Sequence, residues 1–340
     1  MENYTTKKIN PSTIEVKVTI SKDAMSKSYE TVLKNELKNV KAKGFRAGKT
    51  PRAMVEAELK PQIMFDVFNR LAQTNLQNIV SKENIELIAS PEYKDIPEFS
   101  LEKDMTFTVH CTIMPEFKLG NLKKVKVELK GEKVKKEEID KIMSQLEENK
   151  NIKQKKGTNE WAVQAAQIFS FTEVKTVDDL RNAIEKALQT EKDSIIQRQA
   201  ETEALNQAIK LSNIEVPDPA VHYEAHEREH SFNHQLEGMG MRIDQYAAQM
   251  QTTVQSIIDT FHKDAKEALE TDAFLKLYAQ VSKLTVSDSE LEEEIDKVKK
   301  ANAKESDMYE SAEWKEYIRK VSLKQKAYKK FLEEVMPKSK

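Results

Sequence analysis

Gly44-Phe45-Arg46-Ala47-Gly48-Lys49-Thr50-Pro51 places one aromatic side chain between two glycines and among basic residues. Glycine lets a backbone turn tightly at little steric cost. Pro51 suits the first turn of a helix, and Thr50 is a favourable N-cap in front of it. The stretch therefore predicts an exposed loop that leads into a helix and presents Phe45 and Arg46 to a binding partner.

The residues on either side of this loop predict a compact α+β domain. Apolar and polar residues alternate strictly from Thr13 to Ile20 and again from Met105 to Ile113, which is the pattern of half-buried strands. Between these strands, helical spacing predicts a helix from Ser21 to about Val40. A short helix from Pro51 to Leu59 follows the loop, and a longer one begins at Pro61.

The remainder of the chain changes from short mixed elements to long helices. An alternating stretch at Val125–Leu129 predicts a strand, Lys135–Asn149 a polar helix, and the brief apolar run Trp161–Phe171 a further strand. From Val177 onward the chain reads as almost wholly helical. The expected starts and stops of these helices lie at Thr176 with Asp179, Asp218 with Pro219, Gly238 to Gly240, Thr252 with Gln255, and Ser287 with Glu290.

Composition narrows the class of protein. Of 340 residues, 33% are charged and only 7 are glycine, which favours long solvated helices. The net charge of −2 does not indicate a general nucleic-acid binder, but lysines and arginines gather between Lys34 and Arg52, where Glu36 is the only acid. A single cysteine, Cys111, excludes an internal disulfide and is predicted to be an inert core thiol. With no secretory signal and no stretch long enough to span a membrane, we expect a cytoplasmic protein.

The loop, its helical flanks and the order of elements resemble trigger factor, the bacterial ribosome-associated chaperone. The family's loop follows Gly-Phe-Arg-x-Gly-Lys/Arg-x-Pro, and residues 44–51 match it at Gly44, Phe45, Arg46, Gly48, Lys49 and Pro51. The resemblance extends more weakly to the capped helix near Val177 and to the break at 214–217. It implies an α+β fold: a ribosome-binding domain at 1–117, a linker or arm at 118–176, and an elongated, mostly α-helical chaperone domain with arms at 177–340.

Two departures from the family pattern matter. Many members carry a lysine after the loop arginine, where this chain has Ala47, so the docking tip loses one positive charge. Trigger factors usually also contain an FK506-binding-type prolyl isomerase domain before the helical part. Only residues 157–176 are available for it here, and so short a segment cannot build a core. We therefore expect no isomerase activity, and no enzyme activity of another kind.

Gly48-Lys49-Thr50 invites comparison with a nucleotide-binding loop. A P-loop needs glycine at the position of Lys43, follows a strand rather than a helix, and needs the amide that Pro51 lacks. Chaperone action is therefore expected to be independent of ATP and of any cofactor.

Two further sets of residues have both a functional and a plain structural interpretation. Four histidines spaced by four fall on one predicted helix, where neighbouring pairs resemble zinc or nickel sites or form a solvated face. Three methionines surround an expected bend and suit adaptable contact with clients, although filling of the core is the commoner role. The histidines are His222, His226, His230 and His234, and the methionines are Met239, Met241 and Met250.

The leading functional hypothesis is an ATP-independent holdase tethered by Phe45, Arg46 and Lys49 to protein and RNA beside the ribosomal exit tunnel. Its helical part would shield apolar segments of nascent and unfolded chains until they are buried. One alternative is a free cytosolic holdase with weak ribosome affinity, which Ala47 favours. The other is a metal-responsive scaffold that uses the His-rich helix 222–234. A homodimer is left open, and no membrane partner is expected.

Overall fold

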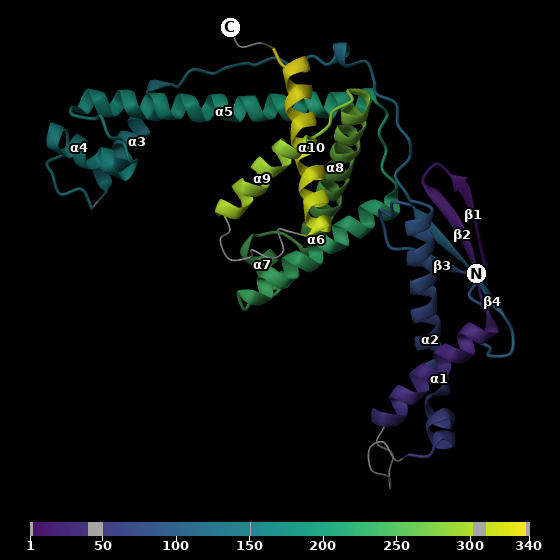
Figure 1. Ribbon diagram of the computed structural model, residues 1–340. Helices are drawn as coiled ribbons and strands as arrows, with labels where there is room; N and C mark the ends of the chain where they lie inside the picture. The colour runs from purple at the N-terminus through teal and green to yellow at the C-terminus, as the bar shows by residue number, and fades with distance from the viewer. Residues whose placement is uncertain (1–2, 40–49, 150, 302–310, 338–340) are drawn as a thin grey trace. The chain divides into compact units, whose positions relative to one another are not determined.

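A computed structural model describes residues 3–39, 50–149, 151–301 and 311–337. The chain divides into two compact units, and each unit combines segments that are distant in sequence. Residues 1–117 and 214–273 form the first unit, and residues 118–213 and 274–340 form the second. Figure 1 labels the elements of both.

The first unit begins with an antiparallel sheet of four strands in the order β1-β2-β4-β3. The strands are β1 (Asn3–Asn10), β2 (Thr13–Ile20), β3 (Glu92–Lys94) and β4 (Met105–Thr112). In the central pair, Val16 lies opposite Val109 and Val18 opposite Phe107, and all four side chains are buried. Both alternating stretches are strands, as predicted, and the structure pairs them as neighbours in the sheet. The mostly exposed edge strand β1 was not predicted.

Two helices pack against this sheet and complete its core: α1 (Lys22–Asn39) and α2 (Arg52–Lys82). The predicted start of α1 is confirmed, since Ser21 Oγ accepts a hydrogen bond from the Ala24 amide at 3.3 Å. The prediction of two helices after the loop was wrong, because α2 runs on without a break through Pro61. Proline removes one helical hydrogen bond, but Val55 and Ile63 on either side of it are buried in the same core.

Cys111 is fully buried in this core, and burial raises the pKa of its thiol to about 11. The thiolate is the reactive form of cysteine. The prediction of an inert core thiol therefore agrees with its surroundings.

Three helices make up the rest of the first unit: α6 (Asp218–Gly238), α7 (Ile243–Gln249) and the first part of α8 (Val254–Val281). Ala225 of α6 and Ala265 of α8 are buried together, and the ring of Phe232 packs edge-on against those of Tyr246 and Phe261. The expected helix boundaries shift slightly. The helix α6 begins at Asp218 itself, and Thr253 rather than Thr252 caps α8 through a 3.1 Å bond from the Ser256 amide.

The second unit is built on the long helix α5 (Val177–Leu211), which starts with the predicted capping box of Thr176 and Asp179. The shorter helices α3 (Lys136–Glu148) and α4 (Asn159–Ile168) pack against it around Trp161, which is only 1% exposed. The predicted strand at Trp161–Phe171 was therefore wrong. Its apolar residues follow helical spacing, and Thr158 caps the helix by accepting from the Trp161 amide at 3.2 Å.

An extended segment precedes α3 in the second unit, after a short 3₁₀ turn at Leu122–Lys124. The predicted strand at Val125–Leu129 was wrong, because these residues belong to no strand. Their backbone is held by a side chain of α5 instead. The Lys126 amide donates to Gln207 Oε1 at 2.9 Å, and Gln207 Nε2 donates to the Lys126 carbonyl at 3.0 Å.

Helices α9 (Asp288–Ala301) and α10 (Ala312–Val335) complete the second unit together with the end of α8. The rings of Phe274, Tyr278 and Phe331 pack against one another in its interior. The predicted capping box at Ser287 and Glu290 is confirmed by bonds in both directions between them. Across the described residues, none of the helices combines the length and the apolar character needed to cross a membrane.

Candidate binding surfaces

Most of the predicted loop site lies outside the described residues. Gly44, Phe45, Arg46, Gly48 and Lys49 all fall within 40–49, so their predicted role is untested by the structure. Pro51 is described: it is exposed, and it occupies the N-cap position of α2 in an extended conformation.

The prediction that Thr50 caps this helix was wrong, because α2 begins one residue later than expected and no side chain caps it. Thr50 is 7% exposed, and its Oγ1 has no hydrogen-bond partner in the described part of the chain. The start of α2 is therefore held by something other than a capping hydroxyl.

An ion cluster of Arg52, Glu30 and Glu56 joins α1 to the first turn of α2. Arg52 forms a two-pronged bond with Glu30 of α1, in which Nη1 donates to Oε2 at 2.9 Å and Nη2 to Oε1 at 2.6 Å. The same guanidinium donates to Glu56 Oε1 at 3.0 and 3.2 Å, and the Tyr29 hydroxyl reaches this oxygen at 3.4 Å. The hydrogen bonds from Arg52 lower the pKa of Glu30. Sequence spacing hints at the pair Arg52–Glu56, but no local signal points to Glu30.

The three predicted client-contact methionines lie at the ends of α6 and α7. Met239 follows α6 and is 75% exposed, Met250 follows α7 and is 57% exposed, and Met241 is half-buried. Met250 lines an open groove of about 370 Å³ between α7 and α8 together with Phe232, Tyr246 and Ile257. Met239 and Met250 thus hold their thioethers in water, and Met250 does so beside an aromatic surface.

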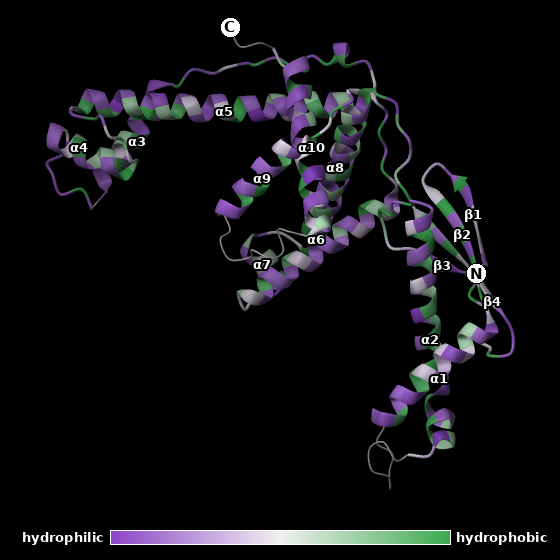
Figure 2. Cartoon of the chain, viewed as in Figure 1, coloured by the Kyte–Doolittle hydropathy of each residue, from purple (hydrophilic) through white to green (hydrophobic). Residues whose placement is uncertain are grey.

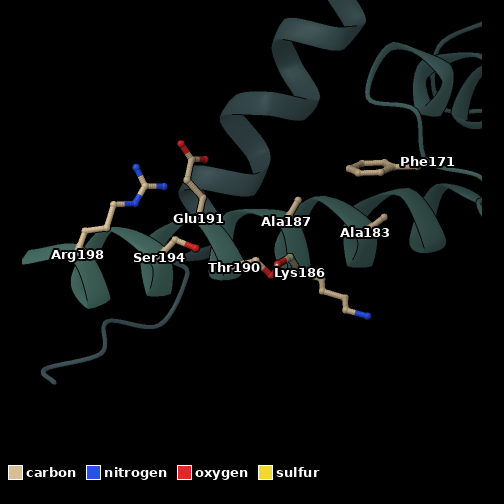
Figure 3. Close-up of a pocket in the computed structure, with 8 residues that line it drawn as sticks. All are labelled: Phe171, Ala183, Lys186, Ala187, Thr190, Glu191, Ser194 and Arg198. Atoms are coloured by element: carbon tan, nitrogen blue, oxygen red, sulfur yellow. Dashed lines mark hydrogen bonds between the residues drawn. The ribbon is translucent and has the colours of Figure 1, made fainter. Parts of the chain in front are cut away.

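A second open groove, of about 520 Å³, runs along α5. Figure 3 shows the ring of Phe171 at one end and the charged side chains of Glu191 and Arg198 at the other, with Ala183 and Ala187 along the helix between them. The Phe171 ring stacks on Phe169, with 5.5 Å between centroids. Further apolar side chains are exposed on and just after α4: Val163 at 41%, Ile168 at 48% and Phe169 at 43%. Sequence reasoning missed this groove because it interpreted the α4 region as a strand.

The four predicted histidines all lie on α6, and all are exposed. The ring of His222 packs edge-on against His262 of α8, with 4.9 Å between centroids. In the described residues, no group of three or more histidine, cysteine or acidic side chains is placed to hold a metal ion. His262 was missed because it is distant in sequence and has no histidine neighbour on its own helix.

Polar and apolar residues are interspersed along the helices of both units, as Figure 2 shows. Within the described residues the grooves are open and partly apolar, and the exposed side chains in or near them include methionine, phenylalanine and aliphatic residues as well as charged ones. Such surfaces suit contact with other polypeptides better than enclosure of a small molecule. The class that fold and surfaces define is thus a mostly helical protein with an α+β N-terminal domain and open, partly apolar surface grooves.

Comparison with known proteins identifies the family within this class. The model described as bacterial trigger factor protein matches residues 2–146, and the model for the trigger factor C-terminus matches residues 176–333. The chain belongs to the trigger factor family. Residues 147–175, between the two matches, include α4.

Curated relatives agree with this assignment. Trigger factor of Leptospira interrogans is 29% identical over 161 residues, which cover 47% of this chain and 36% of the relative. Trigger factor of Halothermothrix orenii is 31% identical over 168 residues, covering 48% of this chain and 38% of the relative. The matched part of the chain thus spans little more than a third of the length of these relatives.

A solved structure of the trigger factor chaperone, from work on its promiscuous substrate recognition in folding and assembly, resembles the whole chain. The TM-score is 0.52 at 14% sequence identity, and the match covers 97% of this chain and 100% of the other. At this identity the likeness shows a common fold: a small N-terminal α+β part followed by long helices.

Proposed function

We propose that the protein is an ATP-independent chaperone that docks beside the ribosomal exit tunnel and shields apolar segments of nascent and unfolded chains. The observation that carries the client-binding half is the exposure of Met239 and of Met250, the latter in an aromatic groove. Flexible thioethers adapt to apolar partners of many shapes. A chaperone needs such contacts because its clients share no sequence.

The docking half rests on the loop motif and on the family. In this proposal Phe45 enters an apolar cleft, while Arg46 and Lys49 pair with RNA phosphates or acidic side chains. The part of the chain up to Phe117 serves as the docking domain, and the linker at 118–176 and the helices from 177 onward bind clients. Weak contacts suffice because tethering raises the effective concentration of a client emerging nearby.

The proposal includes no isomerase chemistry and places the protein in the cytoplasm. Helix α4 lies between α3 and α5, where the family's isomerase domain would be expected, and it packs into the helical core around Trp161. This supports a chain whose action rests on binding alone. An assay with a proline-containing peptide is expected to show no rate above background.

Cosedimentation with ribosomes tests the docking half. The intact protein should pellet with ribosomes at low salt, and the variant Phe45→Ala with Arg46→Ala should remain in the supernatant. A matched control is Phe65→Ala with Arg70→Ala, which removes the same residue types from exposed positions of α2 and should still pellet. If the intact chain fails to pellet, ribosome tethering is wrong. If that protein still suppresses aggregation of an unfolded client, the alternative of a free holdase replaces the tethered one.

The contact between His222 and His262 favours one second candidate, a metal-responsive scaffold. Two imidazoles from neighbouring helices can share one zinc or nickel ion. Calorimetric titration with each metal tests this role, with His262→Ala as the partner variant. Absence of heat at micromolar metal would remove the candidate.

A further inference from the structure

We propose that Arg52, Glu30 and Glu56 form a positioning cluster, which orients the docking motif for binding to its partner. The inference rests on the proposed docking function. The motif is attached to the described structure at Asn39, the last residue of α1, and at Thr50, just before α2. Whatever fixes α1 against the start of α2 also fixes the described residues on either side of the motif.

The start of α2 needs such a cluster for electrostatic reasons. The N-terminal end of a helix carries a partial positive charge, which acidic side chains in the first turn normally offset. The first turn of α2 has no acidic residue, and its first position is the cation Arg52. The neighbouring Glu30 and Glu56 supply the missing negative charge, one from α1 and one from the next turn of α2.

The geometry makes the cluster directional. A guanidinium bound through two parallel hydrogen bonds fixes orientation as well as distance, and Arg52 holds Glu30 in this way. Beneath it, Tyr29 is 3% exposed and Val55 is 1% exposed, so the cluster lies directly over the packed contact of α1 with α2. It thus anchors the helix start, which lacks a capping side chain.

The charge of the cluster and its positioning role predict opposite effects on docking when a carboxylate is removed. The two carboxylates outnumber the one guanidinium, so the cluster carries a net negative charge beside a basic motif. If it acted only through its electrostatic field, removing a carboxylate would strengthen binding to a phosphate-rich partner. If it positions the motif, removing the same carboxylate weakens binding.

The test measures the dissociation constant of the full chain for intact ribosomes at low salt, well below the melting temperature. Glu30→Gln is expected to weaken binding about threefold, the size that exposed but well-oriented ion pairs contribute. Glu58→Gln, the same charge change at an exposed position of α2, should leave binding unchanged or slightly tighter. Equal or tighter binding by Glu30→Gln overturns the inference.

A second pair of variants separates positioning from direct contact by Arg52. Arg52→Gln alone and Arg52→Gln with Glu30→Gln should bind equally weakly, because either change already breaks the pair. Additive losses would mean that Arg52 touches the ribosome itself, which also overturns the inference. Phe45→Ala, measured in parallel, distinguishes failure of this inference from failure of the proposed docking function. If Phe45→Ala binds ribosomes as the intact chain does, docking through the motif is wrong. If Phe45→Ala loses binding while Glu30→Gln keeps it, docking stands and only the positioning role is refuted.

Discussion

Gln207 and Gln189 take the place of a strand partner for the extended segment before α3. Each reaches from α5 to the backbone of this segment and forms bonds in both directions. Gln207 pairs with both backbone groups of Lys126, while Gln189 accepts from the Val134 amide at 3.0 Å and donates to the Glu132 carbonyl at 3.2 Å. A primary amide has a donor and an acceptor in the same spacing as a peptide group, so it substitutes for a neighbouring strand.

Replacement of Gln207 by alanine should release the backbone of Lys126. A net hydrogen bond of this kind contributes about 1 kcal/mol, so protection of the Lys126 amide from hydrogen exchange should fall about fivefold. Exchange measured residue by residue by NMR reports this directly. Gln197→Ala is the matched control, since Gln197 lies on the same helix and bonds to Glu201 instead. Unchanged protection at Lys126 would show that the segment is held by other contacts.

At the scale of elements, local signals predicted some structures and missed others. The alternation of β2 and β4 and the caps at Ser21, Thr176 and Ser287 depend on neighbouring residues, so the sequence alone revealed them. The alternation at Val125–Leu129 was equally regular, but its backbone partner is Gln207, which is distant in sequence. The pattern of a strand was present there without a strand to pair with.

The α4 helix and parts of the candidate surfaces were not predicted, for related reasons. The run from Trp161 is too short to separate a strand from a helix by periodicity, although Thr158 was a readable cap. Loop residues such as Phe45 could be proposed from a motif. The ion pair of Glu30 with Arg52 depends on how two helices cross, which no spacing in the sequence encodes.

Trp161 is expected to dominate the stability of the helical cluster formed by α3, α4 and the start of α5. It is 1% exposed among Ile139, Leu146 and Leu180. Trp161→Ala should lower the free energy of unfolding of this cluster by about 3–5 kcal/mol, the usual effect of deleting a buried aromatic ring. Urea denaturation followed by circular dichroism measures the loss. Val163→Ala, at an exposed position of the same helix, should change the free energy by less than about 0.5 kcal/mol, and a similar value for both variants would contradict this account.

The contact of α9 with α10 is expected to weaken in acid through Glu290. The Lys326 ammonium donates to Glu290 Oε1 at 2.6 Å, the Ser287 amide donates to Oε2 at 2.8 Å, and together they lower the pKa of this carboxyl to about 2. A carboxyl with a depressed pKa stabilises the fold above its ordinary value of 4.5 and loses this effect as the pH falls toward 2.

Glu290→Gln should therefore lower the melting temperature at neutral pH, and the difference from the parent should shrink between pH 4.5 and 2. Thermal melts at several pH values test this, with Glu292→Gln, at an exposed position of α9, as the control. A difference that stays constant with pH would show that the charge of Glu290 does not support the contact.

At the scale of the whole molecule, the client binding that we propose would be distributed over surfaces in both units. The groove beside Met250 belongs to the first unit, and the groove along α5 belongs to the second. Neither is enclosed, and each offers only a modest apolar area. Binding at such surfaces is weak and tolerant of sequence, which suits partners that must later be released to fold.

The isolated protein should suppress aggregation of a chemically unfolded protein without added ATP. Met239→Glu with Met250→Glu should reduce this suppression severalfold, because a charge placed at each exposed thioether opposes burial of apolar client surface. Light scattering during dilution from denaturant measures it. Met54→Glu, at an exposed methionine of α2, should suppress aggregation as well as the parent does. Equal suppression by the parent and both variants would show that Met239 and Met250 do not belong to the client surface.

The core around Trp161 has a consequence for how proteins of this family can gain or lose a domain. In the connection between α3 and α4, Ile152 is partly buried against that core, and the cost of closing a loop grows only slowly with its length. A whole folded module can therefore be spliced into this connection, or deleted from it, while Leu146 and Trp161 remain packed. Insertion or deletion at this one connection would let an ancestral protein gain or lose a catalytic domain while its helical core stays unchanged.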